Sequence, residues 1–347
     1  MAKKRIPSLL MIYTGGTIGM KLDEKSNSLV PFDISQIEEQ VPELKRFGYK
    51  IDKISFSKII DSSDITPDVW ISLAKMIRDN YDRYDGFVIL HGTDTMSYTA
   101  SALSFMLHNL EKPVILTGSQ LPVGILRTDG KENIISSIEI AAAVREDGRP
   151  MVPEVCIFFE SELFRGNRTT KFNAENFKAF RSENFPPLAQ AGVHIKYNTH
   201  LIRYPKRWGK PLKISTNLDT NVTTLKLFPG ITTQAVKGVL NSENCRAVVL
   251  QTYGAGNAPT NREFLNLLNE AGKKGLILIN VSQCLAGKVD MKLYATGVEL
   301  QKLGFITQFD ATFEAIIAKL FVLLGNYPDN KVVKREMKKN ICGEFTS

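Results

Sequence analysis

Residues 9–17, LLMIYTGGT, join an apolar run to a turn rich in glycine and threonine. The five residues of the run, 9–13, do not alternate with polar ones, which is typical of a strand buried on both faces of a parallel sheet. Further apolar runs of strand length follow, and several also lack alternation. They lie at 87–90, 114–116, 155–159, 225–228, 247–250 and 276–279.

The segments between these runs have helical character. Thr66 and Pro67 form a helix start signal, since threonine is a suitable cap and proline fits the first helical position. Val69, Leu73 and Ile77 then fall four apart, on one face of a helix. Segments 96–110 and 312–324 behave similarly. Alternating strands and helices predict an α/β fold, with a larger N-terminal, doubly wound, mainly parallel sheet and a smaller C-terminal α/β domain.

This pattern lapses between about residues 181 and 220. The stretch contains four prolines and a basic run, and it has little periodicity. Such composition is typical of a domain boundary. We therefore expect an N-terminal domain over residues 1–190, a basic, proline-containing linker over 191–214, and a C-terminal α/β domain over 215–347.

The chain has 347 residues and a formal net charge of +8, from 44 basic and 36 acidic side chains. With 43% hydrophobic and 23% charged residues, its composition excludes disordered, collagen-like and fibrous proteins. Segment 203–213 holds five basic residues and no acidic one, and segment 331–347 holds five basic and two acidic residues. The two segments carry the whole excess. Charge runs are usually solvated, and these lack the regular aromatics of a single-strand binding surface, so we do not expect nucleic acid as a partner.

The sequence also indicates a compartment. No apolar run approaches the roughly 20 residues that a membrane span needs, so no membrane association is expected. The basic start is followed by a short apolar stretch that Pro7 interrupts, which favours a first strand over a signal peptide. The four cysteines lie far apart without a CxxC motif, which argues against disulfides or zinc and favours the cytoplasm.

Three of the predicted strands end in similar turns: TGGT at 14–17, HGTDT at 91–95 and TGSQ at 117–120. Ligands of open parallel sheets bind beyond the carboxyl ends of the strands. Glycine permits close approach of the backbone, and hydroxyl and N–H groups can hold a carboxylate or an oxyanion. Each turn alone is explained equally well by helix capping. Together, and with Asp94, they predict a pocket for a small polar substrate.

Several common catalytic arrangements are missing from the sequence. It has no phosphate loop, no GxSxG elbow and no HExxH motif. His91 is either catalytic or bonded to backbone. Threonine remains as a candidate nucleophile; it needs a neighbouring base, and a lysine kept neutral by burial and neighbours could serve.

The motifs TGGTIG (14–19), HGTDT (91–95) and GNRTTK (166–171) resemble those of the asparaginase/glutaminase family, most closely its cytosolic, type I bacterial L-asparaginases. The resemblance spans essentially the whole chain, with the motifs in the family's order. Supporting motifs are DSSD at 61–64, YGAGNAP at 253–259 and YATG at 294–297.

The resemblance implies hydrolysis of L-asparagine to L-aspartate and ammonia without a metal or cofactor. Thr17 matches the nucleophile that attacks the side-chain amide carbon. Thr93, Asp94 and Lys171 match a second polar triad, in which the lysine, oriented by the aspartate, makes the threonine basic enough to activate water or relay a proton.

The resemblance also implies how the substrate is held. Ser62, main-chain groups near Ser63 and the Asp94 carboxylate match the clamp on the α-carboxylate and α-ammonium groups. Backbone groups of the turns that contain Gly16 and Gly92 are expected to bind the substrate and the oxyanion. Asn257 matches a position that reaches the site from a neighbouring subunit, which implies a homodimer or a dimer of dimers.

Two positions depart from the family pattern. Many relatives carry a tyrosine on the loop after TGGT, whereas this loop has none and Leu29 stands at that place. The polar residues 21–28 are still compatible with a gating loop. Some members bind asparagine at an effector site through an arginine, and Gln251 stands there instead, although Thr170 and Cys284 match other positions of that site.

Three alternative functions stay open. The first is the amidase subunit that supplies ammonia to a tRNA-dependent amidotransferase; such a subunit normally has an additional N-terminal module, for which there is no room ahead of Leu9. The second is a non-catalytic asparagine sensor, against which the retention of Thr17, Thr93, Asp94 and Lys171 argues. The third, a nucleic-acid binder, rests only on the two charged segments.

Overall fold

The computed structural model describes residues 5–23, 28–31 and 33–346. The chain divides into two compact units, Met1–Ile214 and Ser215–Ser347.

The first unit is built on an eight-stranded sheet with the order β13-β12-β9-β8-β7-β5-β1-β4. The five strands from β4 to β8 pair in parallel, and β9, β12 and β13 continue the sheet antiparallel. The carboxyl ends of the central strands therefore share one edge. The strands are β1 (Ser8–Tyr13), β4 (Lys50–Ser55), β5 (Gly86–Leu90), β7 (Val114–Thr117), β8 (Val155–Phe159), β9 (Glu162–Arg165), β12 (Ala189–Ala191) and β13 (Ile195–Tyr197).

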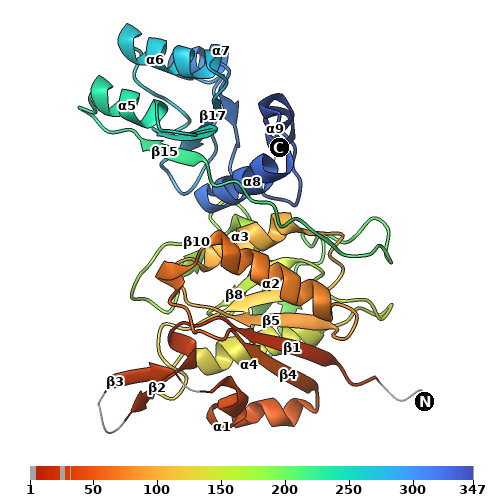
Figure 1. Ribbon diagram of the computed structural model, residues 1–347. Helices are drawn as coiled ribbons and strands as arrows, with labels where there is room; N and C mark the ends of the chain where they lie inside the picture. The colour runs from red at the N-terminus through yellow and green to blue at the C-terminus, as the bar shows by residue number, and fades with distance from the viewer. Residues whose placement is uncertain (1–4, 24–27, 32, 347) are drawn as a thin grey trace. The chain divides into compact units, whose positions relative to one another are not determined.

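Helices cover both faces of this sheet. Figure 1 shows α2 (Pro67–Asn80) and α3 (Met96–Met106) over one face, and α1 (Ile37–Gln40) and α4 (Gly130–Ala142) over the other. Helix α2 starts where the sequence predicts, with Pro67 in its first turn and Val69, Leu73 and Ile77 buried. All residues of β5 and β7, and all but Ser8 of β1, are buried, because apolar side chains meet helices on both faces.

Smaller elements surround this sheet. Three two-stranded pairings bring together β2 with β3, β10 with β11, and β14 with β6. The strands are β2 (Met20–Asp23), β3 (Ser28–Pro31), β6 (Leu107–His108), β10 (Thr170–Lys171), β11 (Phe180–Arg181) and β14 (Lys213–Ile214). The 3-10 helices are η1 (Thr17–Gly19), η2 (Ile34–Gln36), η3 (Pro42–Phe47), η4 (Ser62–Asp64) and η5 (Gly166–Arg168).

The second unit contains a four-stranded parallel sheet in the order β15-β16-β17-β18. Side chains at the N-caps accept backbone N–H bonds at four of its helices, as at Thr232 and Thr312. The two sheets confirm the predicted α/β class. The elements are β15 (Val222–Lys226), α5 (Thr233–Leu240), β16 (Ala247–Thr252), α6 (Arg262–Lys273), β17 (Ile277–Ser282), α7 (Ala295–Lys302), β18 (Ile306–Thr307), α8 (Phe313–Asn326) and α9 (Asn330–Met337).

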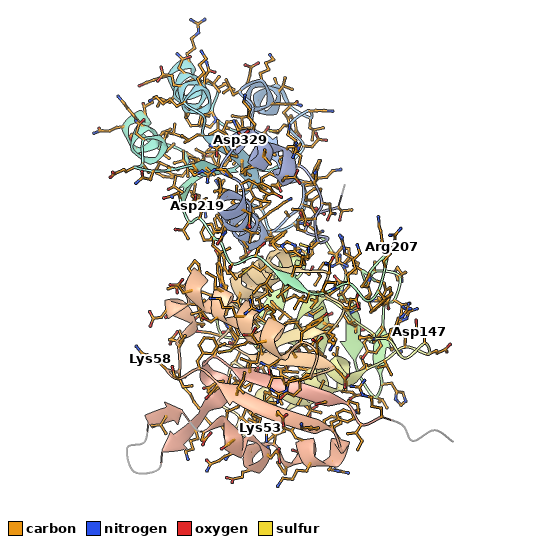
Figure 2. The ribbon with its side chains drawn as sticks, turned by 45° about the vertical axis from the view of Figure 1, so that its right-hand side comes forward. Lys53, Lys58, Asp147, Arg207, Asp219 and Asp329 are labelled. Carbon is orange, nitrogen blue, oxygen red and sulfur yellow. The ribbon has the colours of Figure 1, made fainter. Side chains whose placement is uncertain are left out.

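The segment 191–214, expected as a linker, packs on the first unit. Ala191 and strand β13 belong to its large sheet, and β14 pairs with β6. The backbone N–H of Arg203 donates to Glu154 at 2.6 Å. The five basic residues of the run are exposed, and Figure 2 shows Arg207 at the periphery of the molecule. This basic run is therefore a solvated face of the first unit.

A membrane span needs a long helix of predominantly apolar residues. Within the described ranges, none of the helices is long and apolar enough to cross a bilayer.

Candidate active site

Glycines bring two turns of the first unit into direct contact at the carboxyl edge of the sheet. Gly16, which follows β1, has φ 94°, and a Cβ placed on it would lie 2.4 Å from the Cα of Gly92, which follows β5. A Cβ on Gly92 would in turn lie 2.5 Å from the Oγ of Ser62. Any side chain at either glycine would push the turns apart, so glycine is required at both positions. The turns TGGT, HGTDT and DSSD therefore meet at one place.

Thr93, Asp94 and Lys171 form one cluster beside these turns. The Nζ of Lys171, on β10, donates to Thr93 Oγ1 at 2.8 Å and pairs with Asp94 Oδ1 at 2.7 Å. The lysine side chain is 17% exposed, whereas that of Asp94 is 61% exposed. The lysine side chain is thus largely enclosed by the protein, whereas the Asp94 carboxylate is accessible to a ligand.

Ser62 lies buried beneath the same turns. Its Oγ accepts from the backbone N–H of Asp94 at 3.3 Å, and its carbonyl accepts from Thr95 Oγ1 at 2.6 Å. The neighbouring Ser63 is exposed, and its N–H and hydroxyl both donate to the carboxylate of Asp61 at 2.9 Å. These two bonds lower the pKa of Asp61. The short helix η4 is thereby fixed against the second turn.

Thr17 and Thr93 each follow one of the two glycines in contact, so their backbones lie on neighbouring turns. Thr17 is half-buried at the start of η1. Tyr13 supports this turn from below: its hydroxyl lies 3.4 Å from the Gly16 carbonyl, and a Cβ on Gly19 would lie 2.1 Å from that oxygen. Burial raises the pKa of Tyr13 to about 12. Sequence reasoning placed Tyr13 in the strand but missed this contact.

His91 is bonded through both ring nitrogens and is buried. Nδ1 donates to the Gly92 carbonyl at 2.6 Å, and Nε2 accepts from Thr99 Oγ1 at 2.9 Å. The indole N–H of Trp70 donates to the same hydroxyl at 3.0 Å. Burial lowers the pKa of His91 to about 4, so the ring is neutral at pH 7. Of the two interpretations of this histidine, the structure favours the one in which it supports the turn.

Asp129 organises the third turn, and sequence reasoning missed it. Its carboxylate accepts from the backbone N–H groups of Gln120 and Leu121 at 3.0 and 3.1 Å. The side-chain amide of Asn133 donates to the same carboxylate and to the carbonyl of Gly118. Burial raises the pKa of Asp129 despite these bonds. The signal in the sequence is an acidic residue just before α4, the usual place of a helix cap. In the structure, its side chain bonds to the loop instead of capping the helix.

Asn257 belongs to the second unit, unlike the other candidate residues. It follows β16, where Tyr253 and Asn257 form a bridge, and its Oδ1 accepts from Thr296 Oγ1 at 2.6 Å. Gly256 has φ 108°, and a Cβ on it would lie 2.7 Å from Val289. The turn is therefore held firmly within the second unit.

The loop after Thr17 forms the β2–β3 pairing, in which Leu29 pairs with Leu22. Residues 24–27 and 32 of this expected gating loop lie outside the described residues.

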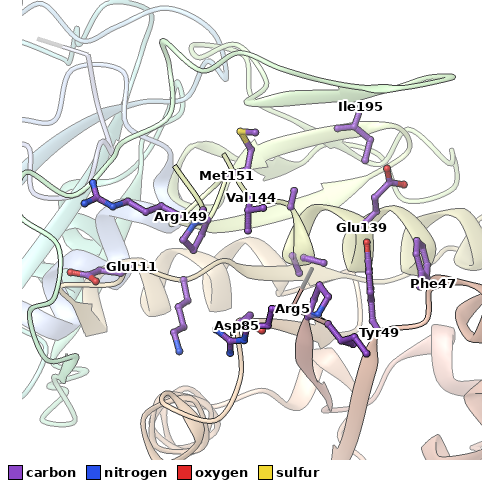
Figure 3. A pocket seen from close by; sticks show the side chains of 18 of the residues that line it. Arg5, Phe47, Tyr49, Asp85, Glu111, Glu139, Val144, Arg149, Met151 and Ile195 are labelled. Carbon is purple, nitrogen blue, oxygen red and sulfur yellow. Dashed lines mark ion pairs between the residues drawn. The ribbon is translucent and has the colours of Figure 1, made fainter. Parts of the chain in front are cut away.

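Two further observations concern other kinds of site. No group of three or more His, Cys, Asp or Glu side chains within 5–23, 28–31 and 33–346 could hold a metal ion. A cavity of about 1010 Å³ lies in the first unit, lined by residues such as Pro7, Tyr49, Asp85 and Glu139 (Figure 3). Pro7 precedes β1 and Asp85 precedes β5, so this cavity opens at the amino edge of the sheet, opposite the turns.

Comparisons with known proteins identify the family to which the chain belongs. The family model "Asparaginase, N-terminal" matches residues 8–203, and "Glutaminase/Asparaginase C-terminal domain" matches 221–337. The chain is 42% identical to L-asparaginase 1 of Escherichia coli over 98% of both chains. It superposes on L-asparaginase I from Vibrio cholerae with a TM-score of 0.89 at 39% identity, covering 99% of this chain and 100% of that one. It is 31% identical to a glutamyl-tRNA(Gln) amidotransferase subunit of Pyrococcus horikoshii, over 99% of this chain and 78% of that protein. The chain therefore belongs to the asparaginase family.

Proposed function

We propose that the protein hydrolyses L-asparagine to L-aspartate and ammonia. The observation that carries the proposal is the Lys171 Nζ bonded to both Thr93 and Asp94, beside two glycine turns in contact. The relatedness to L-asparaginases over nearly the whole chain supports the same reaction.

In the proposed reaction, the hydroxyl of Thr17 attacks the side-chain amide carbon of asparagine. The proton of the Thr17 hydroxyl passes to the amide nitrogen, so cleavage of the carbon–nitrogen bond releases ammonia and leaves an ester between Thr17 and the aspartyl group. Water then attacks the ester carbonyl and restores the hydroxyl. Backbone N–H groups of the turns at Gly16 and Gly92 stabilise the oxyanion of both steps, each donor being worth roughly 3 kcal/mol. Thr93 and Lys171 relay the protons.

The zwitterionic substrate needs one fixed carboxylate and several donors. Asp94 supplies the carboxylate for the α-ammonium group, since its side chain keeps an open face. The Ser62 hydroxyl and main-chain groups near Ser63 bind the α-carboxylate. The overall neutral substrate requires no surplus positive field, so the basic segments have no part in its binding.

We propose further that the active protein is a homodimer or a dimer of dimers, in which Asn257 of the partner subunit completes the site. Exposed apolar side chains in the loops after β17 support this assembly, because such residues are typical of protein interfaces. Leu285, Leu293 and Tyr294 are 56%, 60% and 53% exposed. The widely separated cysteines, all of them free thiols, support a cytoplasmic location.

The second candidate is the amidase subunit of a tRNA-dependent amidotransferase. The 31% identity to the Pyrococcus horikoshii protein favours it, but the chain matches 78% of that protein and 98% of L-asparaginase 1. An asparagine sensor is the third candidate. It would bind asparagine in calorimetry without turnover.

Ammonia release tests the proposal. We expect faster release from L-asparagine than from L-glutamine or D-asparagine, across a range of concentrations that also reveals any sigmoidality. Thr17→Val and Lys171→Met should each remove nearly all turnover. Lys237→Met is the matched control, because Lys237 is exposed on α5. No release from any substrate would refute the enzyme, and normal rates in either variant would remove that residue from the mechanism.

A further inference from the structure

The side chain of Gln120 joins the third turn to the hairpin that carries Lys171. Its Nε2 donates to the carbonyls of Ala174 and Asn176 at 3.0 and 3.1 Å. Carbonyl oxygens only accept hydrogen bonds, so these contacts fix which end of the amide is the NH₂ group. The amide oxygen then faces Thr93, with Oε1 3.5 Å from Thr93 Oγ1.

This orientation assigns the single proton of the Thr93 hydroxyl. Thr93 Oγ1 already accepts from Lys171 Nζ at 2.8 Å, and an amide oxygen cannot donate. In the contact with Gln120, Thr93 is therefore the donor and the amide oxygen the acceptor. The contact is long, as catalytic hydrogen bonds often are before substrate binds.

Gln120 is itself held in place. The Asp129 carboxylate accepts from its backbone N–H at 3.0 and 3.1 Å. At the other end, β10 with Lys171 pairs with β11, and the loop between them, 172–179, contains both carbonyls that Gln120 binds. A continuous set of contacts thus runs from Asp129 through Gln120 to the lysine-bearing hairpin.

We propose that Gln120 is a positioning residue for the Thr93–Asp94–Lys171 cluster, holding the Lys171 hairpin in place and orienting the Thr93 hydroxyl. This inference rests on the proposed function. A proton relay depends on donor and acceptor geometry, and a displacement of about 1 Å can cost on the order of 100-fold in rate. The side chain of Gln120 bonds to Thr93 and to the loop of the Lys171 hairpin, and not to Ser62 or Asp94 of the substrate clamp, so the rate should suffer more than binding.

The test compares two variants of the full chain. Gln120→Met keeps the length of the side chain but removes both the amide oxygen that faces Thr93 and the NH₂ group that binds the loop. Asn173→Ala is the matched control, because Asn173 Oδ1 accepts from the N–H groups of Glu175 and Asn176 and so shapes the same loop without contacting Thr93. Ammonia release gives kcat and KM, and thermal unfolding checks that both variants fold.

We expect kcat of Gln120→Met to fall about 10- to 100-fold with KM within about threefold of wild type, and Asn173→Ala to lose far less. A kcat within twofold of wild type would overturn the inference alone. So would an equal loss in both variants, which would leave the orientation of the Thr93 hydroxyl without a role, or a rise in KM at constant kcat. An inactive wild-type protein would instead refute the proposed function, and the inference with it.

Discussion

Acidification should weaken the first unit through His91. Burial lowers the pKa of this ring to about 4, against its usual value of 6.5. The unfolded chain therefore takes up a proton at higher pH than the folded one, so the contribution to stability is complete above pH 6.5 and is lost as pH falls toward 4. At 1.36 kcal/mol per pKa unit, the loss between pH 7 and pH 5 is about 2 kcal/mol, and it approaches about 3 kcal/mol below pH 4.

Urea unfolding followed by tryptophan fluorescence measures this loss. Both tryptophans, Trp70 and Trp208, lie in the first unit. The hydroxyl of Thr99 is hydrogen-bonded both to Trp70 and to His91, so the fluorescence reports on the surroundings of the histidine. His91→Gln has no titrating ring at this position. We expect the free energy of unfolding of the wild type to fall by about 2 kcal/mol more than that of the variant between pH 7 and pH 5, at fixed protein concentration.

His200→Gln serves as the control, because His200 is exposed, and it should retain the wild-type pH dependence. Equal slopes for wild type and His91→Gln would mean that His91 titrates alike in the folded and unfolded states. That result would refute the reasoning from burial.

Three further predictions concern a close backbone contact, a buried ion pair and a buried carboxylate. Gly16→Ala should reduce ammonia release at least about 100-fold, because its Cβ would lie 2.4 Å from the Gly92 Cα; a normal rate would show that the turns can separate without cost. Lys319→Met should lower the free energy of unfolding of the second unit by about 3–5 kcal/mol in calorimetry, since Glu344, 2.7 Å away and 1% exposed, would lose its ion-pair partner. Adding Glu344→Gln should recover part of that loss, and no recovery would contradict the charge explanation. Asp129→Ala should cost about 1–3 kcal/mol for each backbone N–H left unpaired, measured by urea unfolding, whereas an unchanged midpoint would mean that water replaces the carboxylate.

The sequence determined the buried strands and the turns that follow them. A strand buried on both faces of the sheet needs apolar side chains at successive positions, as in residues 9–13. This requirement is local, so the run of apolar residues is enough to reveal the strand. The glycines of the first two turns are likewise dictated by a backbone conformation and a close approach that other residues would prevent. The sequence therefore sufficed for the α/β class and for the place where the candidate site lies.

The antiparallel end of the large sheet could not be read from the sequence. Strand β13 has three residues with little apolar pattern, so the segment from 191 resembles a linker. It forms a strand because β12 offers it a partner through backbone bonds, which any residue can make.

Only the tertiary structure decided which polar groups meet. Lys171 lies 78 residues beyond Thr93 in the chain and was assigned to the site through the family resemblance alone, yet its amine is 2.8 Å from that hydroxyl. Gln120 ends the third turn but was not assigned a role, Asp129 carried no motif, and the neutral state of His91 follows from burial. Hydrogen-bond partners and desolvation depend on residues brought together from distant parts of the chain, whereas strands and glycine turns are specified by their own few residues.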